Sequence, residues 1–258
     1  MLTTIAAGIC FATVGVHPCS VASITKHPDG PQSYLNRLKE LAEGRSSGGA
    51  LIVAFGEVGL DYDRLHYTNK EDQLKYFEAQ LDIACALDRP LPLFLHSRAA
   101  AEDFEQSLRA RLASLPRRGV VHSFTGTLDE MRRLVEMGFD IGINGCSLKT
   151  EESLEVVRNV PLTSIQLETD GPWCEIRESH ASSKYLDKLR RTLNGHVFPT
   201  LWESVKKEKW REGMLVKGRN ESCRIAEVAV VVAAIKGISV EEVSKHAWDN
   251  SMKMFQLL

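Results

Sequence analysis

The stretch LIVAFGE, residues 51–57, shows the pattern from which the fold can be predicted. Its β-rich run over residues 51–55 does not alternate between apolar and polar positions, which is typical of a strand buried on both faces of a parallel sheet. Gly56 and Glu57 then follow, so a carboxylate comes directly after the apolar run. Further apolar runs of this kind occur at residues 11–16, 91–95, 119–121, 139–143 and 164–167.

Amphipathic segments between these runs indicate helices. Thr68–Glu71, Thr127–Glu130 and Ser239–Glu242 each match a capping box, in which a hydroxyl and a Glu side chain satisfy the free amides at a helix start. We expect Gly138 to end the second of these helices, and residues 226–236 to form another. Strand and helix in alternation predict a parallel α/β fold, either an open sheet or a closed barrel.

The length of 258 residues fits one α/β barrel domain over residues 1–258. The formal net charge is −2, so nucleic acid would have to bind to a local patch. Residues 184–219 contain such a patch, with ten Lys or Arg against four Asp or Glu. We interpret about 186–217 as an insertion. With Trp202 and Trp210 it could form a basic, aromatic lip for a single strand, or it could be an ordinary solvated surface segment.

Six scattered cysteines without a C-x-x-C pair favour reduced thiols and an intracellular compartment, either cytoplasm or nucleus. The apolar N-terminal segment has no basic residue before Lys26, unlike a signal peptide, and is too short to span a bilayer. We therefore expect it to be part of the fold, and we expect no membrane association. The sequence does not set the oligomeric state.

Polar side chains follow the apolar runs: His17, Glu57, His96, His122 and Asp170. The carboxyl ends of parallel strands share one face of the fold, where active sites are built. We therefore expect these side chains to converge, although they are far apart in the sequence.

Two imidazoles and two carboxylates suit Zn²⁺, Mn²⁺ or Fe, or Mg²⁺ with added waters. Each residue also has a structural interpretation: a hydrogen-bonded His, a Glu that caps the next segment, an Asp in a turn before Gly-Pro. The recurrence at several strand ends, each followed by Gly or Ser, favours a metal site.

Eight segments, in order along residues 14–221, resemble the TatD family of metal-dependent deoxyribonucleases, and its eukaryotic branch in particular. They are VGVHP (14–18), GEVGLDYDR (56–64), FLHSR (94–98), VHSFTG (121–126), IGINGCSLK (141–149), LETDGPWC (167–174), SHASSKY (179–185) and RNE (219–221). The resemblance implies a TIM-type (β/α)₈ barrel of the metal-dependent hydrolase kind, with its metal site at the carboxyl ends of the strands.

The resemblance assigns Glu57 as the ligand that bridges two divalent ions, Mg²⁺ or Mn²⁺ with Zn²⁺ as an alternative. His96, His122 and Asp170 would be the other ligands, and Asp170 would also be the general base. Glu57 and Asp170 are thus the implied catalytic residues.

The resemblance further implies that His17, Arg98, Arg219 and Asn220 bind substrate. The implied activity is hydrolysis of phosphodiester bonds in DNA, as a 3′→5′ exonuclease on single-stranded ends.

The chain departs from the family pattern at its start. The family opens with a strand that carries His-x-His, and this chain has no such segment. Only six candidate strands are found where a closed barrel needs eight, so we expect the first strands to be missing and strand edges to be left unpaired. Ser222 stands where the family has Pro, which is a loop change.

The sequence leaves two other functions open. One is a small-molecule amidohydrolase or lactonase on the same barrel, because one scaffold hosts many reactions. Those enzymes often have a lysine where Glu57 stands, which favours the nuclease. The other is a non-catalytic, truncated fragment, which the missing strands would support.

Overall fold

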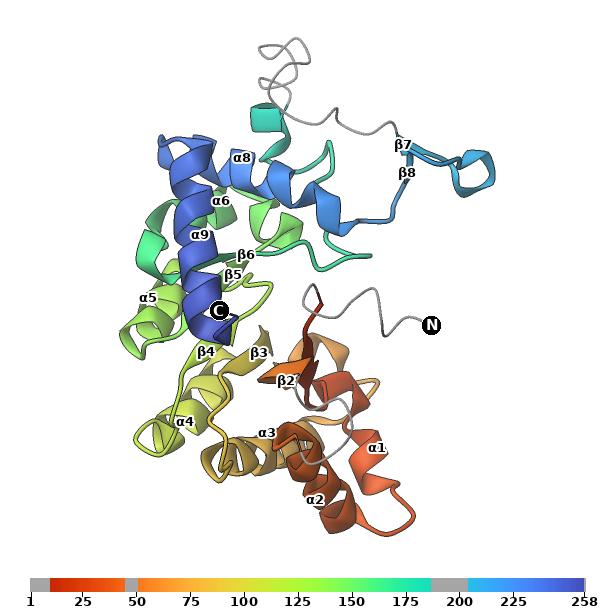
Figure 1. The fold of residues 1–258 in the computed structure, drawn as a ribbon, viewed down its shortest axis with the longest axis vertical. Helices are drawn as coiled ribbons and strands as arrows, with labels where there is room; N and C mark the ends of the chain where they lie inside the picture. The colour runs from red at the N-terminus through yellow and green to blue at the C-terminus, as the bar shows by residue number, and fades with distance from the viewer. Residues whose placement is uncertain (1–9, 45–50, 187–203, 258) are drawn as a thin grey trace. The chain divides into compact units, whose positions relative to one another are not determined.

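The computed structural model describes residues 10–44, 51–186 and 204–257. The chain divides into two compact units. The first unit comprises residues 1–122, 133–140 and 251–258, and the second comprises residues 123–132 and 141–250. Figure 1 shows the elements in chain order. The predicted single domain stays a prediction.

Four parallel strands form the sheet of the first unit, paired in chain order: β1 (Ala12–Val14), β2 (Ile52–Asp61), β3 (Leu93–Arg98) and β4 (Gly119–Val121). All four coincide with predicted runs. β2 and β3 extend beyond their predicted ends, because pairing continues to Asp61 and Arg98. Glu57 and His96 therefore lie within strands and not after them.

Helices cover the strands of the first unit (Figure 1). α2 packs against β1, α3 against β2 and α4 against β3. The helical elements are η1 (Pro18–Ser20), α1 (Ala22–Thr25), α2 (Pro31–Ala42), η3 (Tyr62–Arg64), α3 (Lys70–Cys85) and α4 (Ala101–Arg111).

The capping box predicted at Thr68 is wrong by one residue. Asn69 is the N-cap of α3, and its side-chain oxygen accepts a hydrogen bond of 2.8 Å from the backbone amide of Asp72. The side-chain oxygen of an Asn accepts a hydrogen bond from a free backbone amide as effectively as a hydroxyl oxygen does. Asn69, which is nearer to the helix than Thr68, therefore serves as the N-cap.

Two buried glutamines on α3 hold the ends of β1 and β2. Gln80 accepts a hydrogen bond of 2.8 Å from the amide of Val16 and donates one of 3.2 Å to its carbonyl. Gln73 does the same for Asp61, with distances of 2.8 Å and 3.0 Å. Gln73 and Gln80 are two helical turns apart, so both lie on one face of α3. This face thereby fixes the backbone next to His17 and at Asp61.

Glycines let β1, β2 and β3 approach each other closely. A Cβ atom at Gly56 would lie 2.1 Å from the carbonyl oxygen of Phe94, and one at Gly15 would lie 2.7 Å from Gly56. A Cβ atom at Gly59 would lie 1.8 Å from the carbonyl oxygen of His96. The register of β2 against β3 shifts between Gly56 and Val58. Such a bulge reorients a side chain, here that of Glu57.

The remaining elements lie wholly or partly in the second unit. β5 and β6 pair in parallel, with Ile141 opposite Ile165. The elements are α5 (Leu128–Glu136), β5 (Asp140–Ile143), η4 (Gly145–Leu148), α6 (Glu151–Asn159), η5 (Leu162–Ser164), β6 (Ile165–Leu167), β7 (Ser204–Val205), η6 (Lys207–Lys209), β8 (Leu215–Val216), η7 (Ser222–Arg224), α8 (Ile225–Lys236) and α9 (Val240–Phe255).

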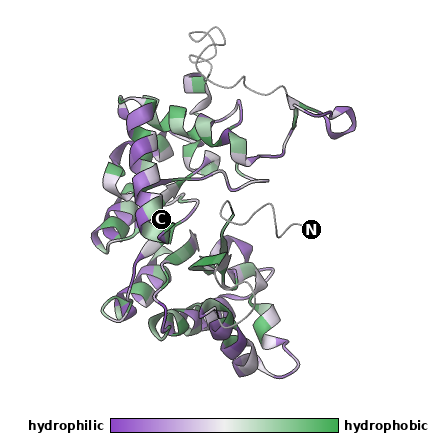
Figure 2. Cartoon of the chain, viewed as in Figure 1, coloured by the Kyte–Doolittle hydropathy of each residue, from purple (hydrophilic) through white to green (hydrophobic). Residues whose placement is uncertain are grey.

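The predicted capping box and terminal glycine of α5 and the predicted helix α8 are confirmed. The Thr127 amide donates to Glu130 at 2.7 Å, and the Thr127 hydroxyl accepts from the Glu130 amide at 3.3 Å. Gly138 follows α5 with a φ of 87°. α8 packs against α6 and β6 and is apolar over most of its length, as Figure 2 shows.

β7 and β8 form a separate two-stranded sheet, and the other six described strands, β1 to β6, are parallel with helices between them, as the sequence predicts. An eight-stranded barrel has two more. Part of the predicted insertion, residues 187–203 with Trp202, lies outside the described residues, as do residues 1–9. In the described part of the chain, no helix combines the length and apolar character needed to cross a membrane.

Gly59→Ala should destabilise the protein more than Gly30→Ala. Both glycines have positive φ, 153° and 84°, so each substitution introduces backbone strain of about 1–3 kcal/mol. Only at Gly59 would the new Cβ atom also collide with a neighbouring strand, since no atom lies within 4 Å of the Cβ position at Gly30. Thermal unfolding of both variants measures the difference. Equal losses would contradict the close contact of β2 and β3.

Candidate metal centre

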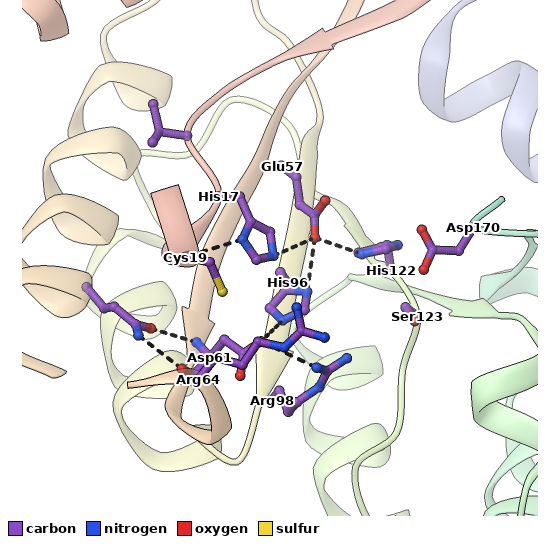
Figure 3. A network of polar contacts seen from close by, with 12 residues as sticks. His17, Cys19, Glu57, Asp61, Arg64, His96, Arg98, His122, Ser123 and Asp170 are labelled. Atoms are coloured by element: carbon purple, nitrogen blue, oxygen red, sulfur yellow. Dashed lines mark hydrogen bonds and ion pairs between the residues drawn. The ribbon is translucent and has the colours of Figure 1, made fainter. Parts of the chain in front are cut away.

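One carboxylate oxygen of Glu57 faces three imidazoles in the first unit (Figure 3). Glu57 Oε1 lies 2.9 Å from His122 Nε2, 3.0 Å from His96 Nδ1 and 3.4 Å from His17 Nε2. His17 follows β1, His96 lies in β3 and His122 follows β4. The structure therefore brings four of the predicted site residues together around one negatively charged atom.

Asp61 holds the His96 ring from its other side. Its side chain is fully buried, and Asp61 Oδ2 lies 3.2 Å from His96 Nε2. With Nε2 facing Asp61, the Nδ1 atom of His96 is the one directed at Glu57. A carboxylate behind a metal-binding histidine fixes the tautomer and the orientation of the ring and makes the ring a better ligand.

Asp61 is a candidate functional residue that the sequence prediction missed. The sequence feature that could have identified Asp61 is an acidic residue at the end of an apolar run, within residues 56–64. Burial could not be inferred from that segment, because β2 was expected to end before it. Arg64 and Arg98 also reach this carboxylate, at 3.8 Å and 3.5 Å from Oδ2.

The hydrogen bonds of His17 distinguish it from the other two imidazoles. Its Nδ1 atom accepts a hydrogen bond of 3.1 Å from the backbone amide of Cys19. A neutral His17 therefore carries its proton on Nε2, the atom that faces Glu57. That tautomer is a hydrogen-bond donor and not a metal ligand. A second cluster of potential ligands, His17, Asp61 and His96, would need His17 as a ligand, and its tautomer opposes this.

Burial and charge shift the pKa values of these groups in different directions. Burial lowers the pKa of His17 to about 4, although the charge of Glu57 opposes the shift. Burial also acts to lower the pKa of His96, but the carboxylates of Asp61 and Glu57 outweigh it and raise that pKa above its ordinary value. Burial acts to raise the pKa of Glu57, but its close contacts with the imidazoles of His122 and His96 outweigh it and keep that pKa well below its usual range.

These residues fit a divalent metal ion. The ligand atoms of Glu57, His96 and His122 lie within 4.8 Å of one another. His96 Nδ1 is buried and has no hydrogen-bond partner, because Glu57 Oε1 is close to it but not aligned as an acceptor. Buried polar atoms are rarely left unpaired, and a cation between nitrogen and oxygen would satisfy both.

Asp170 belongs to the second unit, in the loop that follows β6. It has a positive φ of 51°, and its Oδ2 atom accepts a hydrogen bond of 3.1 Å from the thiol of Cys174. Asn220 donates a hydrogen bond of 2.6 Å to the carbonyl of Thr169, and its amide donates one of 2.9 Å to the carbonyl of Pro172. Asn220 therefore braces the loop that carries Asp170.

The two predicted substrate-binding arginines already pair with acids of their own unit. Arg98 reaches Asp61, and Arg219 donates a hydrogen bond of 2.8 Å to the Glu221 carboxylate. Asn220 is buried, so its contacts with the Asp170 loop explain its presence better than exposure to substrate does. Substrate binding by Arg98, Arg219 and Asn220 stays a prediction.

Comparison with known proteins identifies the family. A family model described as TatD related DNase matches residues 2–256. The chain belongs to the TatD family. It is 52% identical over 248 residues to Deoxyribonuclease Tat-D of Schizosaccharomyces pombe, covering 95% of this chain and 75% of that protein. It is also 30% identical to a Pantoea ananatis protein named 3′-5′ ssDNA/RNA exonuclease TatD, over 96% of this chain and 79% of that protein.

A solved structure supports the fold of this TatD chain. The crystal structure of an uncharacterized amidohydrolase from Saccharomyces cerevisiae matches with a TM-score of 0.85 and 36% identity, over 95% of this chain and 80% of the other. The predicted TIM-type fold and the predicted family are thereby confirmed. As a member of this family the chain is a metal-dependent hydrolase of the nuclease class.

We predict that Asp61→Asn weakens Mn²⁺ binding about 10- to 100-fold near pH 8. The variant keeps the shape of the side chain but removes the charge that makes His96 a strong ligand. Asp103→Asn is the matched control, since Asp103 pairs with Tyr62 and Lys70, apart from this cluster. Calorimetric titration of the metal-free protein measures both. Unchanged affinity in Asp61→Asn would contradict the role of Asp61.

The pH dependence of the same titration gives a second measurement. His96 must lose its proton before Nδ1 can bind a metal, so affinity falls as the pH drops through the pKa of His96. That pKa is raised in the wild-type protein, so the fall begins at a higher pH than for an ordinary imidazole. In Asp61→Asn the fall should move to lower pH. If Asp61→Asn only unfolded the site, the pH at which metal affinity falls would not shift in this way.

Proposed function

We propose that the chain hydrolyses phosphodiester bonds in DNA as a 3′→5′ exonuclease on single-stranded ends. The observation that carries this proposal is the Glu57 oxygen within 3.0 Å of the ring nitrogens of both His96 and His122. A nuclease of this family needs such a nitrogen and oxygen ligand set for divalent ions. The exonuclease activity in the name of the Pantoea relative supports the finer assignment.

The proposed metal ligands would provide carboxylate oxygens and imidazole nitrogens to the divalent ions. Glu57 provides a carboxylate that two ions, Mg²⁺ or Mn²⁺, would share, with Zn²⁺ as an alternative. His96 provides Nδ1 and His122 provides Nε2, the atoms that face Glu57. Asp170 is proposed as a further ligand from the family resemblance of residues 167–174. When bound, the ions lower the pKa of a water molecule and neutralise charge at the phosphate.

The protein's own groups would handle the protons and the phosphate. Asp170 is proposed as the general base that accepts a proton from the attacking water. The Nε2–H group of neutral His17 is a donor suited to a phosphate oxygen. His17 stays neutral at physiological pH because burial lowers its pKa to about 4, so it does not compete with the cations for Glu57.

A basic ribbon supports the preference for single strands. Residues 204–219, which include β7 and β8, have six basic and two acidic residues, and Figure 2 shows the tip of the ribbon in hydrophilic colours. Trp210 in this tip is 51% exposed, and its Nε1 atom donates a hydrogen bond of 2.8 Å to the carbonyl of Met214. An exposed indole that is fixed by a hydrogen bond and surrounded by basic side chains is suited to stack on an unpaired base. The ribbon continues directly into Asn220, which braces the Asp170 loop.

We also propose an intracellular location, in cytoplasm or nucleus. The six cysteines are free thiols in the structure, which suits a reducing compartment.

The purified chain should shorten single-stranded DNA from its 3′ end with Mn²⁺ or Mg²⁺ and not in EDTA. Asp170→Asn should lower the rate about 100-fold or more, because it removes the proposed base. Asp249→Asn is the control, since Asp249 is an exposed acid of α9 that pairs with Lys245. The assay follows oligonucleotides labelled at either end, alone and in duplex.

Several outcomes of this assay would count against the proposal. Activity in EDTA, or full activity of Asp170→Asn, would contradict the metal-dependent mechanism. Equal rates on duplex and single strands would remove the proposed preference, and loss of label from the 5′ end first would reverse the polarity.

Trp210→Ala should raise KM for a single-stranded oligonucleotide about 5- to 100-fold and leave kcat unchanged. This range corresponds to the loss of one base–aromatic stack. Trp248→Ala is a matched control, because Trp248 is a similarly exposed indole, on α9. Steady-state kinetics at several salt concentrations measures both variants. An unchanged KM in Trp210→Ala would identify the ribbon as an ordinary solvated surface.

A further inference from the structure

Two thiols of the second unit lie almost in bonding contact. The Sγ atoms of Cys146, in η4, and Cys174, in the loop after β6, are 2.9 Å apart. The backbone segments that carry them touch, since a Cβ atom at Gly145 would lie 2.1 Å from the carbonyl oxygen of Cys174. The Cys146 amide is fixed by a hydrogen bond of 2.8 Å to the side chain of Asn144. The proximity of the sulfurs is thus built into the backbone.

Cys174 also contacts Asp170. Its thiol donates a hydrogen bond of 3.1 Å to Asp170 Oδ2. Cys174 has a φ of 55°, in the left-handed region that residues with a Cβ atom rarely adopt. Such backbone strain persists where the surrounding structure enforces it, and it gathers at functional sites. The loop therefore holds this thiol between a second thiol and a carboxylate.

We propose that Cys146 and Cys174 form a disulfide on reaction with a peroxide, and that this bond switches off the Asp170 site. The part of this proposal that concerns activity rests on the proposed function, because there Asp170 is the general base. A disulfide bond is about 2.05 Å long, so the sulfurs need to approach by only about 0.9 Å.

The reaction balances with hydrogen peroxide as the oxidant. The Cys146 thiolate attacks one peroxide oxygen, and the O–O bond breaks to leave a sulfenic acid and hydroxide, which takes up the proton that Cys146 released and becomes water. The Cys174 sulfur then attacks the Cys146 sulfur and forms the S–S bond as the S–O bond breaks. The proton of Cys174 leaves through Asp170 Oδ2 and ends on the departing hydroxide as water. Two thiols are oxidised, and one peroxide is reduced to two waters.

The charges around the pair favour this order of events. The close contact with Cys174 lowers the pKa of Cys146, burial opposes the shift, and Lys149 adds to the lowering. This lowering favours Cys146 as the sulfur that attacks peroxide, because the thiolate is the form that reacts. Cys174 donates its single S–H proton to Asp170 Oδ2, and its contact with Cys146, its burial and Asp170 all raise its pKa. Both side chains are half-buried, so a small oxidant can reach them.

Oxidation would change the surroundings of Asp170 in a defined way. A disulfide has no S–H group, so Asp170 Oδ2 loses the donor that now lies 3.1 Å away. Loss of a hydrogen bond that orients a catalytic or metal-binding group typically costs 10–100-fold in activity or metal affinity. We therefore expect nuclease activity to fall about 10-fold or more on oxidation and to return with dithiothreitol.

The test treats the full chain at low concentration with hydrogen peroxide and then blocks the remaining thiols. Mass spectrometry of the digested protein should find the peptides of Cys146 and Cys174 linked, and dithiothreitol should release them. This readout does not depend on activity. Sulfinic acid at Cys146 with no linked peptide would overturn the proposal.

Two variants connect the bond to activity. Cys146→Ser leaves the contact between Cys174 and Asp170 in place, so it should keep the basal activity and resist peroxide. Cys85→Ser is the matched control, a half-buried thiol on α3, and should stay as sensitive as the wild type. Inhibition that persists in Cys146→Ser would overturn the switch. An inactive reduced protein that still forms the linked peptide would contradict the proposed function but not the thiol pair.

Discussion

The close approach of three backbone strands is the constraint on which the first unit depends. Gly15, Gly56 and Gly59 leave no space for a side chain between β1, β2 and β3. This contact places the following polar side chains within a few ångströms of each other, and the bulge beside Gly56 reorients Glu57. The metal-binding chemistry of the cluster is therefore a consequence of how closely the main chains pack.

Hydrogen bonds from buried polar groups then orient the side chains that the packed strands bring together. Gln73 and Gln80 satisfy the backbone at the ends of two strands, and Asp61 satisfies one nitrogen of His96. The remaining nitrogen of His96 is directed at Glu57. Buried polar groups that are satisfied in this way make a site rigid before any ion binds, which is what a catalytic centre requires.

One loop of the second unit carries both a carboxylate, that of Asp170, and a thiol, that of Cys174. Asp170 is the proposed oxygen ligand and base, and Cys174 beside it carries a thiol that can be oxidised. A hydrogen bond joins the two, so the oxidation state of the thiol and the acceptor strength of the carboxylate are linked. In the proposed mechanism and the proposed switch, phosphodiester hydrolysis and thiol oxidation thus both involve one atom, Asp170 Oδ2.

The sequence by itself determined the parallel α/β fold, the family and the residues that gather around Glu57, because buried strands, capping signals and short motifs are local patterns. Thr68 in place of Asn69 shows the limit of such patterns, since two neighbouring residues can both serve as caps. Only the tertiary structure revealed Asp61 and the Cys146–Cys174 pair, and only the structure oriented each imidazole. Burial, tautomer and contacts between distant segments depend on packing, which no local stretch of sequence contains.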